Sequence, residues 1–275
     1  MQNKLKIGFI GGGNMAAALI GGLVTELTGP EHIHVVDLNQ MSLTRMETEF
    51  GVTTSLGFDD RLMPLDVIIL AVKPQQLRDV VGELKPFLNE QLLLSIAAGV
   101  RATDIARWLN GYQKIVRAMP NTPALIGKGM TGLFALPEVS EEQKNAAESI
   151  MHAVGNAIWL EDEDKIDVVT AVSGSGPAYV FYFIEALQQA AMELGLTEDQ
   201  GMQLAIGTFN GAAQLAMHSS EPVSVLRERV TSKGGTTYAA LSSMEADDVK
   251  LSIIKAVKLA AARGRELGEE YGQQA

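Results

Sequence analysis

The chain has 275 residues, 47% of them apolar and 20% charged, a composition that excludes a disordered or low-complexity protein. Its 22 Lys and Arg against 33 Asp and Glu give a formal net charge of −11, the wrong sign for a surface that binds nucleic acid or an anionic membrane. The lack of cysteine excludes disulfides and a cysteine nucleophile, and we expect a cytoplasmic protein that spans no membrane.

Short apolar runs alternate with helix-like stretches over the first 160 residues. The runs that predict strands buried on both faces of a parallel sheet are 6–10, 34–37, 67–72, 92–96 and 115–118. The stretches that predict helices between them are 43–50, 75–84 and 103–109, and another helix over 140–154 opens with a capping box at Ser140 and Gln143. This alternation predicts βαβ units.

A glycine motif, G-G-G-N-M-A at residues 11–16, follows the first strand directly and opens a helix. Gly11 permits the tight turn, Gly13 lets the backbone approach a pyrophosphate, and Ala16 keeps the helix close to the sheet. Unpaired N–H groups at the helix N-terminus hold phosphate without basic side chains. The strand before and the helix after predict a dinucleotide site in a Rossmann-type sheet.

Asp37 ends the second strand, 26 residues after Gly11, where such sites contact the adenosine ribose. Its carboxylate can accept hydrogen bonds from a 2′-OH and repels a 2′-phosphate, which favours NADH. Asn39 and Arg45 lie just beyond and could accommodate that phosphate, and Asp37 could instead cap a helix. The sequence leaves the choice between NADH and NADPH open.

Two later loops follow strands, A-V-K-P at 71–74 and A-M-P-N-T-P at 118–123. Ligands of an open parallel sheet lie beyond the carboxyl ends of its strands, so we expect both loops to face the nicotinamide half of the cofactor. A cofactor loop is a better interpretation of Lys73 than a Schiff-base lysine, because nothing nearby argues for a depressed pKa. Asn121 can hydrogen-bond either backbone or ligand.

Four consecutive acids at 161–164 mark a change in composition, and we interpret them as a solvated connector. Almost no strand is predicted beyond them. Residues 178–194 are apolar nearly all round, which indicates a helix buried within a bundle or between subunits. The predicted fold class is therefore α/β, with a doubly wound dinucleotide-binding domain over 1–161 and an all-helical domain over 162–275.

The last glycine-rich segment, T-S-K-G-G-T-T at 231–237, lies between two predicted helices. Its backbone N–H groups and hydroxyls can converge on a small anion such as a carboxylate. A turn with capping threonines is an equal alternative. The run S-G-S-G-P at 173–177 is interpreted as a helix break rather than a hydrolase site, and the four histidines form no metal-ligand pattern, so we expect no metal.

Six segments together resemble the pyrroline-5-carboxylate reductase family, which catalyses the last step of proline synthesis. They are IGFIGGGNMA at the start, AVKP at 71–74, SIAAGV at 95–100, RAMPNTPALIGKGMT at 117–131, AVSGSGPAYVFYFIEAL at 171–187 and TSKGGTT at 231–237. The resemblance covers nearly the whole chain. It implies an NAD(P)H-dependent oxidoreductase that transfers hydride to the C=N bond of 1-pyrroline-5-carboxylate and gives L-proline. It also implies that the helical domain interlocks with a second copy in a homodimer, and that five dimers can form a decamer.

The resemblance also implies roles for matching residues. Those that contact the pyrophosphate would be Gly11, Gly13, Asn14 and Met15, and those beside the nicotinamide would be Ala71, Val72, Lys73 and Pro74. The substrate carboxylate would lie on Ser232, Gly234, Gly235 and Thr236. Thr237 would be the catalytic residue that hydrogen-bonds the ring nitrogen. The chain departs from the family pattern at Lys233, where proline is usual, and at Asp37, because many relatives prefer NADPH.

Two other functions fit parts of the sequence. A dehydrogenase acting on a β-hydroxy acid usually needs a lysine acid/base in its helical domain, and residues 176–194 contain no lysine. A non-catalytic NAD(P)-binding regulator would keep the first glycine turn but has no use for the second one at 231–237.

Overall fold

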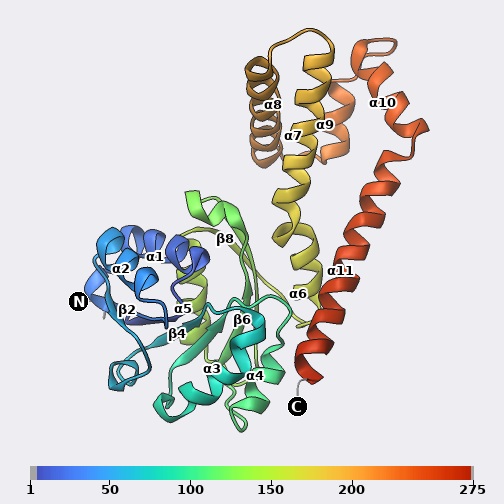
Figure 1. The fold of residues 1–275 in the computed structure, drawn as a ribbon. Helices are drawn as coiled ribbons and strands as arrows, with labels where there is room; N and C mark the ends of the chain where they lie inside the picture. The colour runs from blue at the N-terminus through green and yellow to red at the C-terminus, as the bar shows by residue number, and fades with distance from the viewer. Residues whose placement is uncertain (1–4, 274–275) are drawn as a thin grey trace. The chain divides into compact units, whose positions relative to one another are not determined.

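The structure, a computed structural model, describes residues 5–273 and contains one sheet with the strand order β3-β2-β1-β4-β5-β6-β7-β8 (Figure 1). The strands are β1 (Ile7–Ile10), β2 (Ile33–Val36), β3 (Thr53–Ser55), β4 (Val67–Leu70), β5 (Leu92–Ser95), β6 (Ile115–Met119), β7 (Gly129–Ala135) and β8 (Gly155–Trp159). Neighbouring strands pair in parallel except β6 with β7. Strands β2 and β3 lie on one side of β1, and β4, β5 and β6 follow on its other side. The order in which strands are added to the sheet therefore reverses between β1 and β4.

Helices cover both faces of this sheet. Figure 1 shows α1 (Asn14–Glu26) and α2 (Gln40–Phe50) on one face and α3 (Leu77–Leu84) and α4 (Ala102–Trp108) on the other. Every residue of β1, β2, β4 and β5 is buried, which explains why these strands are continuous apolar runs in the sequence. The predicted doubly wound sheet is confirmed.

The sequence predicts five strands, and the structure adds three at the two ends of the sheet. β3 is a short edge strand of threonine and serine, all of it at least partly exposed. β8 alternates between half-buried and exposed residues, and β7 contains two glycines. None of the three is the continuous apolar run that marks a buried strand, so the pattern that finds the central strands misses them.

The helix predicted over 140–154 is α5 (Glu141–His152), and its predicted capping box is confirmed. Ser140 Oγ accepts a hydrogen bond from Gln143 N, and Gln143 Oε1 accepts one from Ser140 N. Short 3₁₀ turns occupy several loops, namely η1 (Pro30–His32), η2 (Asp60–Leu62), η3 (Pro74–Gln76), η4 (Lys85–Phe87) and η5 (Thr122–Ile126). Pro74 begins η3, where the N–H that proline lacks would have no partner within the helix.

The acidic run at 161–164 is exposed at Glu161, Asp162 and Asp164, in agreement with the solvated interpretation, but Glu163 is packed into the sheet domain. Arg117 of β6 is fully buried, and its guanidinium pairs with Glu163 and with Asp167 of α6 (Lys165–Val169), each at 3.3 Å. Asp164 pairs with Arg101 at 3.1 Å. A buried guanidinium requires such partners, and the acids that supply them stand far from it in the sequence.

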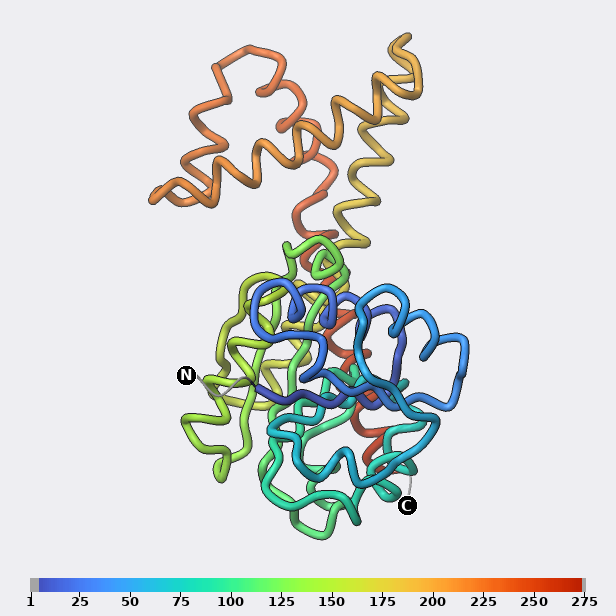
Figure 2. The backbone as a smooth tube through the Cα atoms, turned by 90° about the vertical axis from the view of Figure 1, so that its left-hand side faces the viewer, coloured from blue at the N-terminus to red at the C-terminus, as the bar shows by residue number. Residues whose placement is uncertain are grey.

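The chain forms two compact units, one from residues up to 175 together with the segment from 260 onward, and one from 176–259. The segment after α6 continues as a π-helical turn, η6 (Thr170–Gly174), within the first unit. The end of α11 (Val249–Gln273) also belongs to that unit: Tyr271 Oη lies 3.0 Å from Gln75 Nε2, and Arg107 donates to the Gly272 carbonyl at 2.6 Å. Figures 1 and 2 show this last part of α11, in red, alongside α4. The predicted domain boundary between 161 and 162 stays a prediction.

The second unit consists of α7 (Gly176–Glu193), α8 (Glu198–His218), α9 (Val223–Arg229), α10 (Thr236–Ala246) and the first part of α11. Its large apolar side chains are mostly exposed: Phe181 is 62% exposed, Tyr182 70% and Leu204 59%. Within the helices of this unit, only Gly201 and Ala205 of α8 are fully buried. No helix in the described part of the chain has the length and apolar character needed to cross a membrane.

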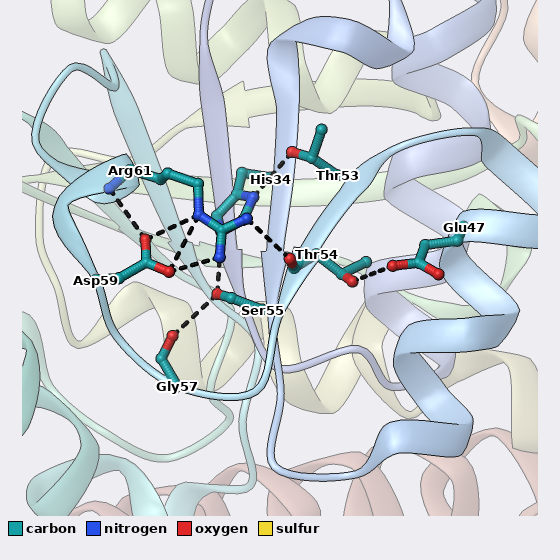
Figure 3. Close-up of polar contacts among 8 residues, drawn as sticks. All are labelled: His34, Glu47, Thr53, Thr54, Ser55, Gly57, Asp59 and Arg61. Atoms are coloured by element: carbon teal, nitrogen blue, oxygen red, sulfur yellow. Dashed lines mark hydrogen bonds and ion pairs between the residues drawn. The ribbon is translucent and has the colours of Figure 1, made fainter.

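His34 joins β2 to the edge strand β3. Its ring nitrogens lie 2.8 Å from Thr53 Oγ1 and 3.1 Å from Ser55 Oγ, and only 4% of its surface is exposed (Figure 3). Burial lowers the pKa of His34 below its usual 6.5, and the positive charge of Arg61 lowers it further. The imidazole is therefore neutral at neutral pH, so only one of its two ring nitrogens carries a proton to donate.

The lowered pKa of His34 predicts a loss of stability in mild acid. Because the unfolded chain takes up this proton more readily, the stabilisation is present above the ordinary histidine pKa of 6.5 and is lost as the pH falls below it. A His34→Gln variant keeps one donor and one acceptor, so its free energy of unfolding should fall less than that of the parent between about pH 7 and about pH 5. Urea unfolding followed by the fluorescence of Trp108 and Trp159 measures this, and identical pH slopes would contradict it.

Candidate functional site

The predicted cofactor residues lie at the carboxyl ends of the parallel strands. Gly11 follows β1, and its N–H donates to the carbonyl of Val36 at the end of β2, at 2.8 Å. Ala71 follows β4 and donates to the carbonyl of Ile10 at 2.8 Å. The end of β1, where the strand order reverses, is thus bonded on both sides, and this is where an open α/β sheet binds its ligand.

The glycine turn combines one very crowded position with one open position. Gly11 has φ +103°, and a Cβ there would lie 2.8 Å from the carbonyl oxygen of Ala71, so no side chain fits. Gly13 is exposed, and a Cβ there would meet nothing within 4 Å. The turn therefore packs against β4 at Gly11 and leaves its backbone accessible at Gly13.

The first turn of α1 offers free backbone donors. Gly13 is its N-cap and supplies no side-chain hydrogen bond, and the first turn contains no acidic residue. The amides at the start of a helix have no partner within the helix and carry partial positive charge. This open N-terminus beside an accessible glycine fits the pyrophosphate of a dinucleotide, with Asn14 and Met15 as the first residues of the helix.

Asp37 and Asn39 contact backbone next to this turn. The Asp37 carboxylate accepts hydrogen bonds from Gly12 N at 2.6 Å and from Asn39 N at 2.8 Å. Asn39 is the N-cap of α2, since its Oδ1 accepts from Met41 N and Ser42 N. The alternative that Asp37 caps this helix is therefore wrong. Its carboxylate instead accepts a hydrogen bond from Gly12, the second glycine of the motif.

The loop after β4 carries the residues predicted to lie beside the nicotinamide. Ala71, Val72 and Pro74 are half-buried, whereas Lys73 is exposed and caps η3 without a side-chain bond. The loop begins immediately beside Gly11, so its position matches the prediction. The contacts of these four residues with a cofactor stay predictions.

Asn121 links the loop after β6 to η6 and to β7. Its Nδ2 donates to the Ser173 carbonyl in η6 at 3.0 Å, and its Oδ1 accepts from Met130 N in β7 at 2.9 Å. Only 8% of Asn121 is exposed, so both ends of the amide are used inside the protein. This residue fixes the loop after β6, and its predicted contact with the cofactor stays a prediction.

The predicted carboxylate turn connects α9 to α10. Gly234 has φ +74°, and Gly235 is the N-cap of α10, which has no side-chain cap and no acid in its first turn. The hydroxyl of Thr231 donates to the Arg227 carbonyl at 2.6 Å, so it binds the end of α9 and does not cap α10. The alternative of capping threonines is therefore wrong for α10, whose N-terminal amides are open beside Thr236 and Thr237.

Residues 5–273 bring no three His, Asp or Glu side chains into a group that could hold a metal ion. The expectation that the protein uses no metal stays a prediction.

Comparison with known proteins covers almost the entire chain. A family model described as pyrroline-5-carboxylate reductase dimerisation matches residues 163–267, and one described as NADP oxidoreductase, coenzyme F420-dependent, matches residues 6–99. The pyrroline-5-carboxylate reductase of Pseudomonas aeruginosa is 42% identical over 98% of this chain and 98% of its own length. The enzyme of the same name from Pisum sativum is 35% identical over 97% of each chain. The chain belongs to the pyrroline-5-carboxylate reductase family.

Solved structures of pyrroline-5-carboxylate reductases have the same fold. The structure from Coxiella burnetii superposes with a TM-score of 0.90 and is 44% identical, over 96% of this chain and 99% of that one. The structure from Plasmodium falciparum, described with NADP bound, has a TM-score of 0.87 and 30% identity, over 98% of this chain and 99% of that one. The family predicted from the six segments is confirmed, and so is the predicted fold class, a dinucleotide-binding sheet domain followed by a helical dimerisation domain.

The contrast between Gly11 and Gly13 predicts that an alanine lowers stability at the first position and cofactor affinity at the second. Gly11→Ala should lower the free energy of unfolding by at least about 2 kcal/mol, because the new methyl group meets backbone at a positive φ. Gly13→Ala should change stability by less than about 1 kcal/mol and still weaken NAD(P)H binding at least about tenfold, because its methyl group points into open space that the cofactor needs. Urea unfolding and cofactor titration separate the two effects, and normal cofactor affinity in Gly13→Ala would contradict the site.

The internal bonds of Asn121 predict a stability effect. Asn121→Ala leaves the Met130 amide and the Ser173 carbonyl without their partner, so the free energy of unfolding should fall by about 2 kcal/mol. Asn89→Ala is the matched control, because Asn89 is exposed, and it should change stability by less than about 0.5 kcal/mol. Equal stabilities of the two variants in urea unfolding would show that Asn121 has no such role.

Proposed function

We propose that this chain reduces 1-pyrroline-5-carboxylate to L-proline with NAD(P)H, the last step of proline synthesis. The observation that carries the proposal is a pair of open helix N-termini, at Gly13 for α1 and at Gly235 for α10. Each follows a glycine turn, and neither is closed by a side-chain cap or an acid. A dinucleotide and a small carboxylic acid are the two anions that this reaction brings together.

In this proposal the first unit holds the cofactor. The pyrophosphate lies on the turn formed by Gly11, Gly13, Asn14 and Met15, and residues 71–74 line the nicotinamide side. Asn121 keeps the neighbouring loop in place through its bonds to η6 and β7. The bound reduced nicotinamide supplies the hydride, so the chain itself needs neither a nucleophile nor a metal.

The second turn holds the substrate in this proposal. Ser232, Gly234, Gly235 and Thr236 bind the carboxylate through backbone N–H groups and hydroxyls. Thr237 is the catalytic residue, and its hydroxyl hydrogen-bonds the ring nitrogen. An imine nitrogen is basic enough to enter protonated, so Thr237 can act without a strongly shifted pKa. Correct placement of the two ligands supplies most of the rate.

The assembly follows from the helical unit. The matched dimerisation model supports a homo-oligomer, in which the exposed apolar faces of α7 and α8 are buried by a second copy. Further assembly of five dimers into a decamer, the cytoplasmic location and the absence of a nucleic-acid partner are part of the proposal.

The reaction and the role of Thr237 are tested together by enzyme kinetics. The purified protein should oxidise NADH or NADPH only when 1-pyrroline-5-carboxylate is present. Thr237→Ala should lower kcat by about ten- to a hundredfold with cofactor affinity within about twofold, because one hydrogen bond to the reacting ring is lost.

Thr237→Ser is the matched control, because it keeps the hydroxyl and should keep most of the activity. Full activity in Thr237→Ala would remove Thr237 from the mechanism. Tight NADH binding without oxidation in the presence of the imine would instead favour a non-catalytic NAD(P)-binding regulator.

A further inference from the structure

Charged side chains hold both backbone polar groups of Gly12. Its N–H donates to the Asp37 carboxylate at 2.6 Å, and its carbonyl accepts from Arg45 Nη2 at 3.1 Å. Gly12 is the middle glycine of the turn, and a Cβ there would lie 3.4 Å from Asp37 Oδ2. A carboxylate and a guanidinium thus fix the two peptide groups that flank Gly12, between β1 and α1.

The Asp37 carboxylate is half-buried at the carboxyl end of β2. It follows β2 directly, and both of its oxygens are positioned by backbone donors, Gly12 N and Asn39 N. No ion pair to Asp37 occurs among residues 5–273. A fixed, unneutralised carboxylate at this place accepts hydrogen bonds from ribose hydroxyls and repels an added phosphate.

Arg45 is the single Lys or Arg in the segment 37–45, and it is directed at the glycine turn. Its Nη1 lies 3.4 Å from Asn14 Oδ1, and its Nη2 donates to the Gly12 carbonyl. Its Nε is buried without a hydrogen-bond partner in the described structure. Part of this guanidinium is therefore enclosed by protein, and each Nη nitrogen makes one contact with the glycine turn. A 2′-phosphate at the end of β2 would meet the Asp37 carboxylate, whereas Arg45 is directed at the turn.

We propose that this chain prefers NADH, that Asp37 is the residue that excludes the 2′-phosphate of NADPH, and that Arg45 positions the glycine turn for either cofactor. The proposal deepens the proposed function and rests on its dinucleotide site. It does not depend on the identity of the imine, because it concerns the adenosine end of the cofactor.

The experiment measures dissociation constants of NADH and NADPH for the intact protein without substrate, from the change in nicotinamide fluorescence. The parent should bind NADH at least about tenfold more tightly than NADPH, because a like charge opposes the phosphate. Asp37→Asn keeps one acceptor oxygen and removes the charge, so it should reduce the ratio to about threefold or less. Asp37→Ser gives the same measurement with a smaller side chain.

Three controls separate charge from structure. Glu138→Gln makes the same change of charge on an exposed residue after β7, at the opposite edge of the sheet because β7 is antiparallel to β6, and should leave the ratio unchanged. Arg45→Gln should weaken both cofactors by a similar factor. Raising the salt concentration should narrow the gap between the cofactors in the parent, since salt screens the repulsion.

Equal or tighter binding of NADPH by the parent would overturn the proposal, and so would an unchanged ratio in both Asp37 variants. A selective loss of NADPH binding in Arg45→Gln would also overturn it, because Arg45 would then bind the phosphate. Failure of the proposed reaction is recognised separately: the protein would bind NADH with the expected preference and would not oxidise it when 1-pyrroline-5-carboxylate is added.

Discussion

The contact between Gly11 and the Ala71 carbonyl is the constraint on which the cofactor site depends. The strand order reverses between β1 and β4, so the loops that leave these two neighbouring strands diverge to opposite faces of the sheet. A turn this close to β4 is possible only with glycine, since any side chain at Gly11 would overlap the backbone of Ala71. The same close turn aims the N-terminus of α1 at the ligand space. The strand order, the glycine turn and the dipole of α1 therefore all contribute to the same proposed binding place.

In the proposed sites the anions are bound by backbone groups, and the net charge of the chain explains why this matters. A net charge of −11 gives no general attraction for phosphate or carboxylate, so attraction has to be local and directional. The uncapped first turns of α1 and α10 supply it, because free amides at a helix N-terminus act at short range and carry no net charge. In the proposal made above, Asp37 adds selectivity by repelling a 2′-phosphate. Specificity would then come from a placed negative charge as much as from attraction.

The sequence predicts the parts of this fold that are determined locally. Buried parallel strands such as β1 and β4 are uninterrupted apolar runs, and the glycine turn is recognisable because its strand and helix are adjacent in the chain. The edge strand β3 is not recognisable, because its side chains are polar: Thr53 and Ser55 hydrogen-bond His34, and Thr54 hydrogen-bonds Glu47. The pairing of Arg117 with Glu163 joins residues 46 positions apart, so the packing of Glu163 into the sheet domain is not recognisable until the tertiary structure is known.

The hydrogen bonds around Gly12 are another feature that the sequence does not predict, because they too join residues far apart in the chain. The sequence places Asp37 at the end of β2 and notes Arg45 beyond it, but it leaves open whether either binds ribose, phosphate or backbone. The answer depends on how α2 returns toward the turn, which begins with the cap that Asn39 makes to Met41 and Ser42. That short-range cap orients the first turns of α2, and Arg45 on its second turn then reaches the Gly12 carbonyl.

The two units obtain their stability in different ways. The first unit has a continuous core of buried apolar side chains around its sheet. Substitutions at Gly11 and Asn121 in this unit therefore have definite expected effects on the free energy of unfolding. The helices of the second unit bury almost none of their large apolar residues within one chain, although their capping is strong at Thr197 and their apolar content is high. Helices of this kind are stabilised by packing and not by propensity, so this unit acquires its stability from a second copy of the chain. The turn at 231–237 belongs to that unit, so the proposed substrate site lies in the part of the chain whose apolar side chains are mostly exposed within one copy.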